Sequence, residues 1–169
     1  RQPTFPIRRL SILSLSSMKK FLAMVSVVFL MTVSYGAYVV FTLPDVQALK
    51  VKNPTVTALM EERALERGVK AGSIRSWVPY DNISPHLRNA VLVAEDAAFF
   101  QHPGYDLEQI KESAKKNFKE RRFARGASTI TQQLAKNLYL STSRSPLRKI
   151  REFFIAQEME RWLSKKRIF

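Results

Sequence analysis

An acidic pair beside an apolar helical stretch is the first group of residues that could do chemistry. Glu95 and Asp96 end a segment in which apolar residues recur at helical spacing, and a turn containing His102 and Gly104 follows. Neighbouring positions on a helix point about 100° apart, so the two acids are not expected to share a proton. The negative end of the helix dipole and nearby phenylalanines favour the protonated form of a carboxyl group and make it a better base. We therefore predict that Glu95 is a general base. The alternative is that Glu95 and Asp96 are ordinary surface acids.

A turn rich in hydroxyl and amide side chains is the second group. The sequence GASTITQQ at 126–133 places a glycine and several polar side chains at the expected start of a helix. Free backbone N–H groups and the positive end of the helix dipole bind anions at such a position. A helix cap with a polar first turn is the simpler alternative. The residues of interest are Gly126, Ser128, Thr129, Gln132 and Gln133.

Cations follow this turn in the sequence. Lys136 and Asn137 come shortly after it, and Arg144 lies in a short serine-rich loop. From 111 to 167 there are 16 basic and 5 acidic residues. Such an excess is often a solvated face, and near a membrane it can contact anionic headgroups. Because these cations flank the anion-binding turn, we predict that they help to bind an anionic substrate.

The last group lies at the start of a long helical stretch. Arg148 and Glu152 are one helical turn apart, with Lys149 between them. A pair at this spacing can be purely structural and contributes about 0.2–0.5 kcal/mol. Glu152 is nonetheless the only carboxylate in the first half of that stretch. It is therefore kept as a second candidate for the site.

The composition excludes several classes of protein. The 169 residues contain no cysteine and two histidines, so disulfides, thiolate nucleophiles and zinc sites with sulfur ligands are excluded. A histidine-rich metal centre is disfavoured because two histidines are too few to form one. The formal net charge of +14 calls for an anionic partner, such as nucleic acid, anionic lipid or a phosphorylated substrate. Nucleic acid is not expected, because the sequence has no helix-turn-helix or RNA-binding signature.

An uncharged stretch at 21–43 predicts a transmembrane anchor. Its 23 residues form a helix of about 34 Å, against about 30 Å for a hydrocarbon core. Residues 1–20 contain five basic and no acidic residues, so the positive-inside rule places them in the cytoplasm and the rest of the chain outside. A cleaved secretory signal is the alternative. Residues 1–17 precede Met18 and are treated as an upstream extension without a function.

Helix-start signals recur after the anchor, and strand-like alternation is nearly absent, so we predict an all-α fold. Residues 44–83 contain several prolines and glycines and one short helix at about 57–67, which is typical of a linker and a docked extended segment. The folded domain is expected at 84–169. The start signals there are Ser84-Pro85, Asp106, Thr129 with Gln132 at capping-box spacing, and Ser145-Pro146.

Apolar stripes predict which faces of these helices are buried. One helix is expected to end near Glu95 and the next near the basic loop at 121–126. The last helix, running to about Ser164, is apolar on most of its circumference and is expected at the centre of the domain. The stripe residues are Leu87, Ala90, Val91 and Ala94 in the first helix and Leu107, Ile110, Ala114 and Phe118 in the second.

These motifs, in this order, resemble those of the family 51 glycosyltransferases, the peptidoglycan transglycosylases that polymerise lipid II. EDAAFFQHPG at 95–104 is similar to the family's EDxxFxxHxG, GASTITQQ with LAKN at 126–137 to its second motif, and RKIRE at 148–152 to RKxxE. The lead-in at 43–60 is similar to that of monofunctional, membrane-anchored members. The next motif, of the ILxxYLN type, is represented only by its first residues at 167–169. The resemblance implies a lysozyme-like transglycosylase domain, incomplete at its C-terminus.

The resemblance also implies a role for each candidate residue. Glu95 would deprotonate the acceptor sugar's 4-hydroxyl as it attacks the anomeric carbon with inversion, and Glu152 would orient or stabilise the donor site. Lys136 and Arg144 correspond to family positions near the pyrophosphate. The other donor-site residues are Ser128, Thr129, Gln132, Gln133, Asn137, Arg148 and Lys149. The supporting residues are Asp96, Phe99, His102, Gly104 and Gly126.

Partners and location follow from the same resemblance. The expected partners are lipid II, the growing glycan strand, the bacterial membrane and other cell-wall synthesis proteins. The expected location is the bacterial cytoplasmic (inner) membrane, in a single pass with the catalytic domain on the periplasmic side. No cofactor is required, and assistance by Mg²⁺ or Mn²⁺ at the pyrophosphate stays open.

Two other functions are weighed against this one. The first is a membrane-anchored basic module that binds anionic lipid or polymer without catalysis. The second is a hydrolase of the lysozyme kind, which needs a carboxylic acid to protonate its leaving group. The cation-rich donor region argues against the hydrolase.

Overall fold

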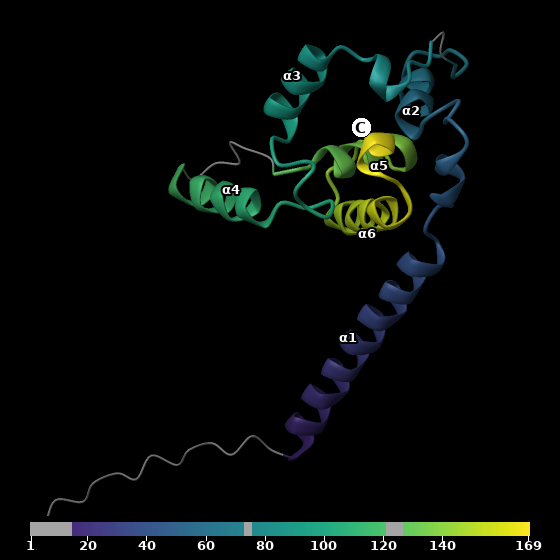
Figure 1. Ribbon diagram of the computed structural model, residues 1–169. Coiled ribbons are helices and arrows are strands. Elements are labelled where there is room, and N and C mark those ends of the chain that lie inside the picture. Colours follow the sequence, from purple (N-terminus) through teal and green to yellow (C-terminus); the bar gives the residue numbers. More distant parts are fainter. Residues whose placement is uncertain (1–14, 73–75, 121–126) are drawn as a thin grey trace, which may run out of the picture. The chain divides into compact units, whose positions relative to one another are not determined.

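The computed structural model describes residues 15–72, 76–120 and 127–169. It divides into two compact units, one ending at Thr42 and one running from Leu43 to Phe169, and each is described by itself. Figure 1 shows the course of the chain. Gly126 and the basic loop at 121–126 lie outside the described residues.

The described part of the first unit is mainly one long helix, α1 (Leu15–Phe41). Over Ser16–Phe41 this helix is long and apolar enough to cross a membrane. The hydroxyl groups of Ser26 and Thr32 each donate to the carbonyl four residues earlier. Because hydrocarbon offers no partner to a polar group, these internal bonds suit α1 to a lipid environment. The helix is therefore consistent with membrane anchoring.

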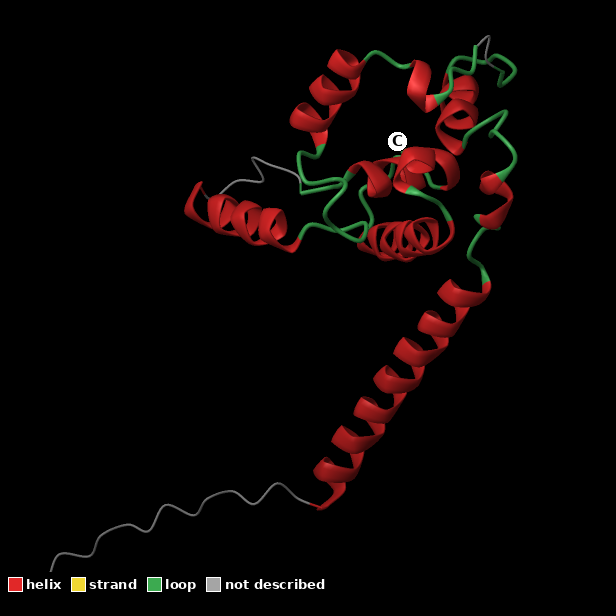
Figure 2. Cartoon of the chain, viewed as in Figure 1, coloured by secondary structure: helices red, strands yellow, loops and turns green. Residues whose placement is uncertain are grey.

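The second unit is helical, with no strand among its described residues (Figure 2). This confirms the all-α prediction. Its elements are the 3₁₀ helices η1 (Gln47–Lys50) and η2 (Tyr80–Asn82) and the α-helices α2 (Ala58–Glu66), α3 (Pro85–Glu95), α4 (Leu107–Glu120), α5 (Ile130–Tyr139), α6 (Pro146–Trp162) and α7 (Lys165–Ile168). The predicted last helix ends before Ser164, because Leu163 and Ser164 have extended backbone and Ser164 caps α7 instead.

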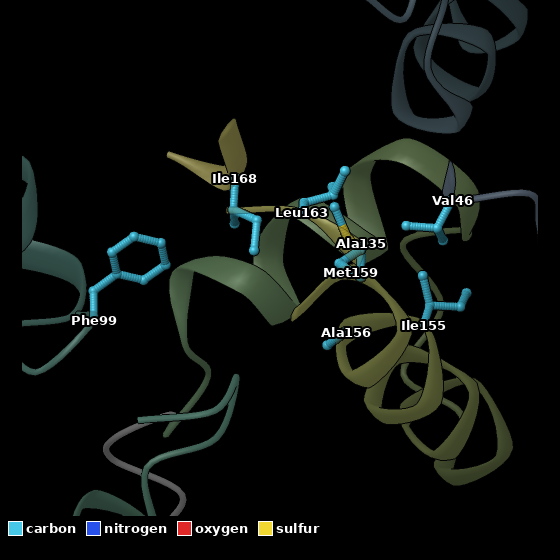
Figure 3. Close-up of a cluster of buried hydrophobic side chains, with 8 residues drawn as sticks. All are labelled: Val46, Phe99, Ala135, Ile155, Ala156, Met159, Leu163 and Ile168. Carbon is cyan, nitrogen blue, oxygen red and sulfur yellow. The ribbon is translucent and has the colours of Figure 1, made fainter. Parts of the chain in front are cut away.

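The hydrophobic core is built around α5 and α6, which pack against each other. Ala135 of α5 and Ile155, Ala156 and Met159 of α6 are fully buried in it (Figure 3). Burying a large apolar side chain stabilises a fold by about 1.5–3 kcal/mol, so these contacts fix the two helices relative to each other. The other buried members are Val46, Phe99, Leu163 and Ile168.

The predicted helix starts are capped in two different ways. The side chains of Thr129 and Asp106 each accept a hydrogen bond from the N–H three residues further on, at 3.3 and 2.9 Å, as predicted. Ser84 and Ser145 make no such side-chain bond. The proline that follows each serine has no N–H to satisfy, which suits the first position of a helix.

The predicted burial of the α3 and α4 stripes is wrong for the described structure. Leu87 and Val91 on α3 and Phe118 on α4 are exposed, and α3 has no buried residue. Helix α6 is not buried on all sides either, since Ile150 is exposed on the face opposite Ile155. The reason is the same in each case: no element among the described residues packs extensively over these faces.

The segment before Ser84 takes part in the packing of the second unit. Val46 and Ala64 are buried, α2 packs against α5, and η1 packs against α6. The guanidinium of Arg167 donates to the carbonyls of Leu49 (2.6 Å) and Lys52 (3.0 Å). The region expected to be a linker therefore supports the helices that carry the candidate residues.

Candidate active site

Glu95 and Gln133 connect the first two predicted clusters. Glu95 is the last residue of α3, and Gln133 lies in the first turn of α5. The side-chain amide of Gln133 donates to Glu95 Oε2 at 2.8 Å. Glu95 is otherwise exposed rather than enclosed by the neighbouring phenylalanines. One carboxylate oxygen is thus held in place, while Oε1 has no hydrogen-bond partner among the described residues.

Asp96 joins the same two clusters through its buried carboxylate. Its Oδ2 accepts from the backbone N–H of Ile130 at 3.0 Å, and its Oδ1 lies 2.9 Å from Nε2 of His102. Ile130 is the first residue of α5, and its N–H is one of the groups that a helix leaves unpaired. A carboxylate at that end is further favoured by the helix dipole. Asp96 therefore fixes the end of α3 to the start of α5, and His102 fixes the turn to Asp96.

Gly104 and Thr129 close the turn on the other side. Gly104 has a left-handed backbone with φ of 85°, and a Cβ atom there would lie 2.8 Å from Cγ of Glu160. Thr129 is buried, and its hydroxyl donates to the carbonyl of Gly104 at 2.8 Å while it caps α5. Only glycine fits this backbone and this space. Gly104 consequently has a structural reason to be glycine in this turn.

Glu152 is the centre of a cation cluster at the start of α6. Its buried carboxylate accepts from Arg148 through one oxygen and from Lys149 through the other. Lys149 Nζ also reaches Ser128 Oγ (2.9 Å) and Gln132 Oε1 (3.4 Å) on the neighbouring turn. Two cations around one carboxylate leave a net positive charge. Since Glu152 is bound by both cations, it can orient them but is not free to act as a base.

The remaining predicted cations lie at the two ends of the α5–α6 connection. Lys136 is half-buried on α5 and Arg144 is exposed in the loop, and neither side chain has a hydrogen-bond or ion-pair partner among the described residues. Asn137 follows Lys136 on α5 and is half-buried. Among the predicted site cations, Lys136 and Arg144 are therefore the two left available to a ligand.

Phe99, a predicted supporting residue, is fully buried, and its ring contacts that of His102 at a centroid distance of 6.4 Å.

Glu160 is a partly buried carboxylate that none of the sequence motifs indicates. It accepts from the Thr131 hydroxyl (2.5 Å) and from Lys165 Nζ (2.7 Å). Its contacts tie the end of α6 to α5 and to α7. Nothing in the sequence indicated this role, because Thr131 is 29 residues away and Lys165 follows a break between two helices.

A cavity of about 620 Å³ lies apart from these residues. It is lined mainly by apolar side chains and by none of the predicted site residues. Across the described part of the chain, no group of three or more acidic or histidine side chains is placed to hold a metal ion.

The geometry brings a base and a cation cluster to one end of α5. Gln133 binds Glu95, and the preceding Gln132 binds Lys149. A phosphate oxygen could replace Ser128 or Gln132 beside Lys149, because hydrogen bonds between two charged groups are stronger than those to neutral partners. The arrangement suits proton removal at one position and stabilisation of negative charge at another.

Comparison with known proteins identifies the family. A family model described as Transglycosylase matches residues 61–169, and the chain belongs to that family. It is similar to the biosynthetic peptidoglycan transglycosylase of Nitrosospira multiformis, with 45% identity over 119 residues, 69% of this chain and 52% of the relative. The one from Cupriavidus pinatubonensis is 52% identical over 95 residues, 56% of this chain and 38% of the relative.

This membership confirms the resemblance to family 51 transglycosylases and the lysozyme-like all-α fold class. It does not favour the alternative of a basic module without catalysis. The chain spans about half the length of the curated relatives it matches.

Proposed function

We propose that this protein is a peptidoglycan glycosyltransferase that polymerises lipid II into glycan strands. Its relatives are biosynthetic peptidoglycan transglycosylases. The observation that carries the proposal is the adjacent pair Gln132 and Gln133, which bind Lys149 and Glu95 respectively. This pair places a general base and a cation cluster at the same end of α5.

The proposed reaction is an inverting transfer between two lipid-linked sugars. Glu95 Oε1 takes the proton of the acceptor's 4-hydroxyl while that oxygen bonds to the anomeric carbon of the donor. The bond between this carbon and the pyrophosphate oxygen breaks, and the lipid pyrophosphate leaves with the electron pair. Because the leaving group is already a stable anion, the donor site needs cations more than a general acid.

The positive charges of the site supply this stabilisation. Lys149 and Arg148 are oriented by Glu152, and Lys136 and Arg144 are free to contact the pyrophosphate. We propose that Ser128 and Asn137 complete the donor site, while the buried Thr129 fixes the turn that carries Ser128. No cofactor is required in this proposal, and Mg²⁺ or Mn²⁺ bound to the pyrophosphate itself would be compatible with it.

The proposed location agrees with the substrate's chemistry. The polyprenyl tail of lipid II is in the bilayer, so its headgroup lies at the membrane surface. Helix α1 is long and apolar enough to anchor the chain there. Basic residues before the span support a cytoplasmic N-terminus, which puts the catalytic unit on the periplasmic side of a bacterial inner membrane. Cell-wall synthesis proteins are expected partners.

A substitution at Glu95 tests the proposal. In the full-length protein, Glu95→Gln should lower the rate of glycan polymerisation from lipid II by about 10²–10⁴-fold, since an amide cannot accept the proton. Thermal unfolding should be unchanged, because the side chain can still bind Gln133. The amount and length of polymer formed over time, followed on gels, measure this rate.

Glu108→Gln is the matched control, since Glu108 is an exposed glutamate on α4 paired with Lys111. It should polymerise lipid II at the normal rate. Normal polymerisation by Glu95→Gln would contradict the role of Glu95 as a base. Short cleaved fragments in place of polymer from the unsubstituted protein would identify a hydrolase instead.

A further inference from the structure

Glu62 on α2 makes a two-point contact with a loop that is 80 positions away in the sequence. Its Oε2 accepts from the backbone N–H of Thr142 at 2.9 Å, and its Oε1 accepts from the hydroxyl of the same residue at 2.7 Å. These two bonds hold the pKa of Glu62 below its ordinary value, the hydroxyl bond being the larger cause. A carboxylate bound to two donors of one residue fixes that residue in orientation as well as in position.

The loop at 141–145 joins α5 to α6 and carries Arg144. Its other side is held by Arg148, whose Nε donates to the carbonyl of Ser143. Arg148 is also bound to Glu152, so this second contact leads directly to the cation cluster. The two residues before Arg144 are therefore both held: Thr142 by Glu62 and Ser143 by Arg148. The side chain of Arg144 itself is exposed and has no partner among the described residues.

Helix α2 is packed well enough to serve as a fixed support. It contacts α5, and its Ala64 is buried. Thr57 caps its first turn by accepting from the N–H of Met60 at 3.2 Å. The support for the loop therefore comes from a helix that precedes all the motifs.

We propose that Glu62 is a positioning residue, which fixes the 141–145 loop so that Arg144 faces the lipid pyrophosphate. This inference rests on the proposed function. An arginine on a free loop loses backbone and side-chain freedom when it binds an anion, and this loss weakens binding. Fixing Thr142 and Ser143 in advance removes the backbone part of that cost. Glu62 acts on Arg144 and does not touch the substrate.

The test compares Glu62→Ala with Glu61→Ala in the full-length protein. Glu61 is the exposed neighbour of Glu62 on the same helix. Glu62→Ala should raise KM for lipid II about fivefold to tenfold, within the range of coupled side chains, with little change in kcat. Hydrogen exchange of the 141–145 amides should accelerate. Glu61→Ala should change neither quantity, and Glu62→Gln, which keeps one acceptor for the Thr142 N–H, should restore part of the affinity.

A double substitution shows whether the effect passes through Arg144. Arg144→Ala should itself raise KM, and adding Glu62→Ala should raise it no further, because the cation that Glu62 positions is already absent. Thr142→Val removes only the hydroxyl bond and should act in the same direction as Glu62→Ala with a smaller effect. Thr142→Val therefore keeps the test usable if the Glu62→Ala protein does not fold.

The outcomes separate this inference from the proposed function. An unchanged KM with accelerated exchange in the loop would overturn the positioning role and leave the proposed function intact. Additive effects of Glu62→Ala and Arg144→Ala would overturn it as well. If the unsubstituted protein forms no polymer from lipid II, the proposed function fails and this inference fails with it.

Discussion

The turn at Gly104 shows how single residues set the spacing of the candidate site. Its carbonyl binds Thr129 at the start of α5, and its Cα faces Glu160 on α6. Asp96 and His102 hold the preceding part of the same turn. A side chain at position 104 would therefore push against α6 and disturb the approach of Glu95 to Gln133.

We predict that Gly104→Ala destabilises the second unit more than Gly68→Ala does. Both glycines have positive φ, but only Gly104 lacks space for a Cβ atom. The left-handed backbone costs alanine about 1–2 kcal/mol at either site, and the contact with Glu160 adds about 1–3 kcal/mol at Gly104. Urea unfolding followed by tryptophan fluorescence measures both values. Equal losses at the two sites would contradict the tight contact.

Residue type and spacing predicted which side chains to consider, but not which of them meet. The helix end at Glu95 and the pair Arg148–Glu152 follow from local spacing, and the structure shows both. The bond from Gln133 to Glu95 spans 38 positions and that from Thr142 to Glu62 spans 80. No periodicity relates residues so far apart, because their meeting depends on how whole helices pack.

Helices α5 and α6 form the part of the fold on which the site depends. Their buried faces pack together, and Lys149 in the first turn of α6 contacts Gln132 in the first turn of α5 and Ser128 just before it. Hydrophobic periodicity predicted that these segments are helices with an apolar face. Periodicity does not predict which element covers an apolar face. For this reason the prediction that the stripes on α3 and α4 are buried in the core is wrong for the described structure.

Helix α6 should tolerate substitution very differently on its two faces. Ile155 is fully buried in the core, whereas Ile150 is 43% exposed. We expect Ile155→Ala to lower the free energy of unfolding by about 2–5 kcal/mol and Ile150→Ala by less than about 1 kcal/mol. Denaturant titration of the two variants measures the difference. A loss at Ile150 as large as that at Ile155 would show that something covers the exposed face in solution.

At the scale of the whole molecule, a net charge of +14 does not by itself select a ligand. Part of this charge lies on α4, where Lys115 and Lys119 are exposed. Another part is concentrated around Glu152, where the cations are held by a buried carboxylate. Exposed charges are screened over about 8 Å at physiological salt, and partly buried ones are screened less. The two groups should therefore differ in their effect on binding.

We predict that Lys149→Ala weakens binding of undecaprenyl pyrophosphate about tenfold or more, because it removes a charged hydrogen bond. The double change Lys115→Glu and Lys119→Glu should alter the affinity by less than about twofold at 0.15 M salt. Titration of the detergent-solubilised protein with the lipid pyrophosphate measures both affinities. Equal losses would favour a diffuse electrostatic surface over a defined site.

The contact of Arg167 with Leu49 and Lys52 has a consequence for the order in which the chain folds. Synthesis proceeds from the N-terminus, so these two carbonyls emerge from the ribosome more than a hundred residues before the guanidinium that binds them. Until then the carbonyls of Leu49 and Lys52 lack the guanidinium that binds them in the folded chain. Contacts between distant parts of a sequence form late and slow folding. Completion of this region is therefore expected to follow translation of α7.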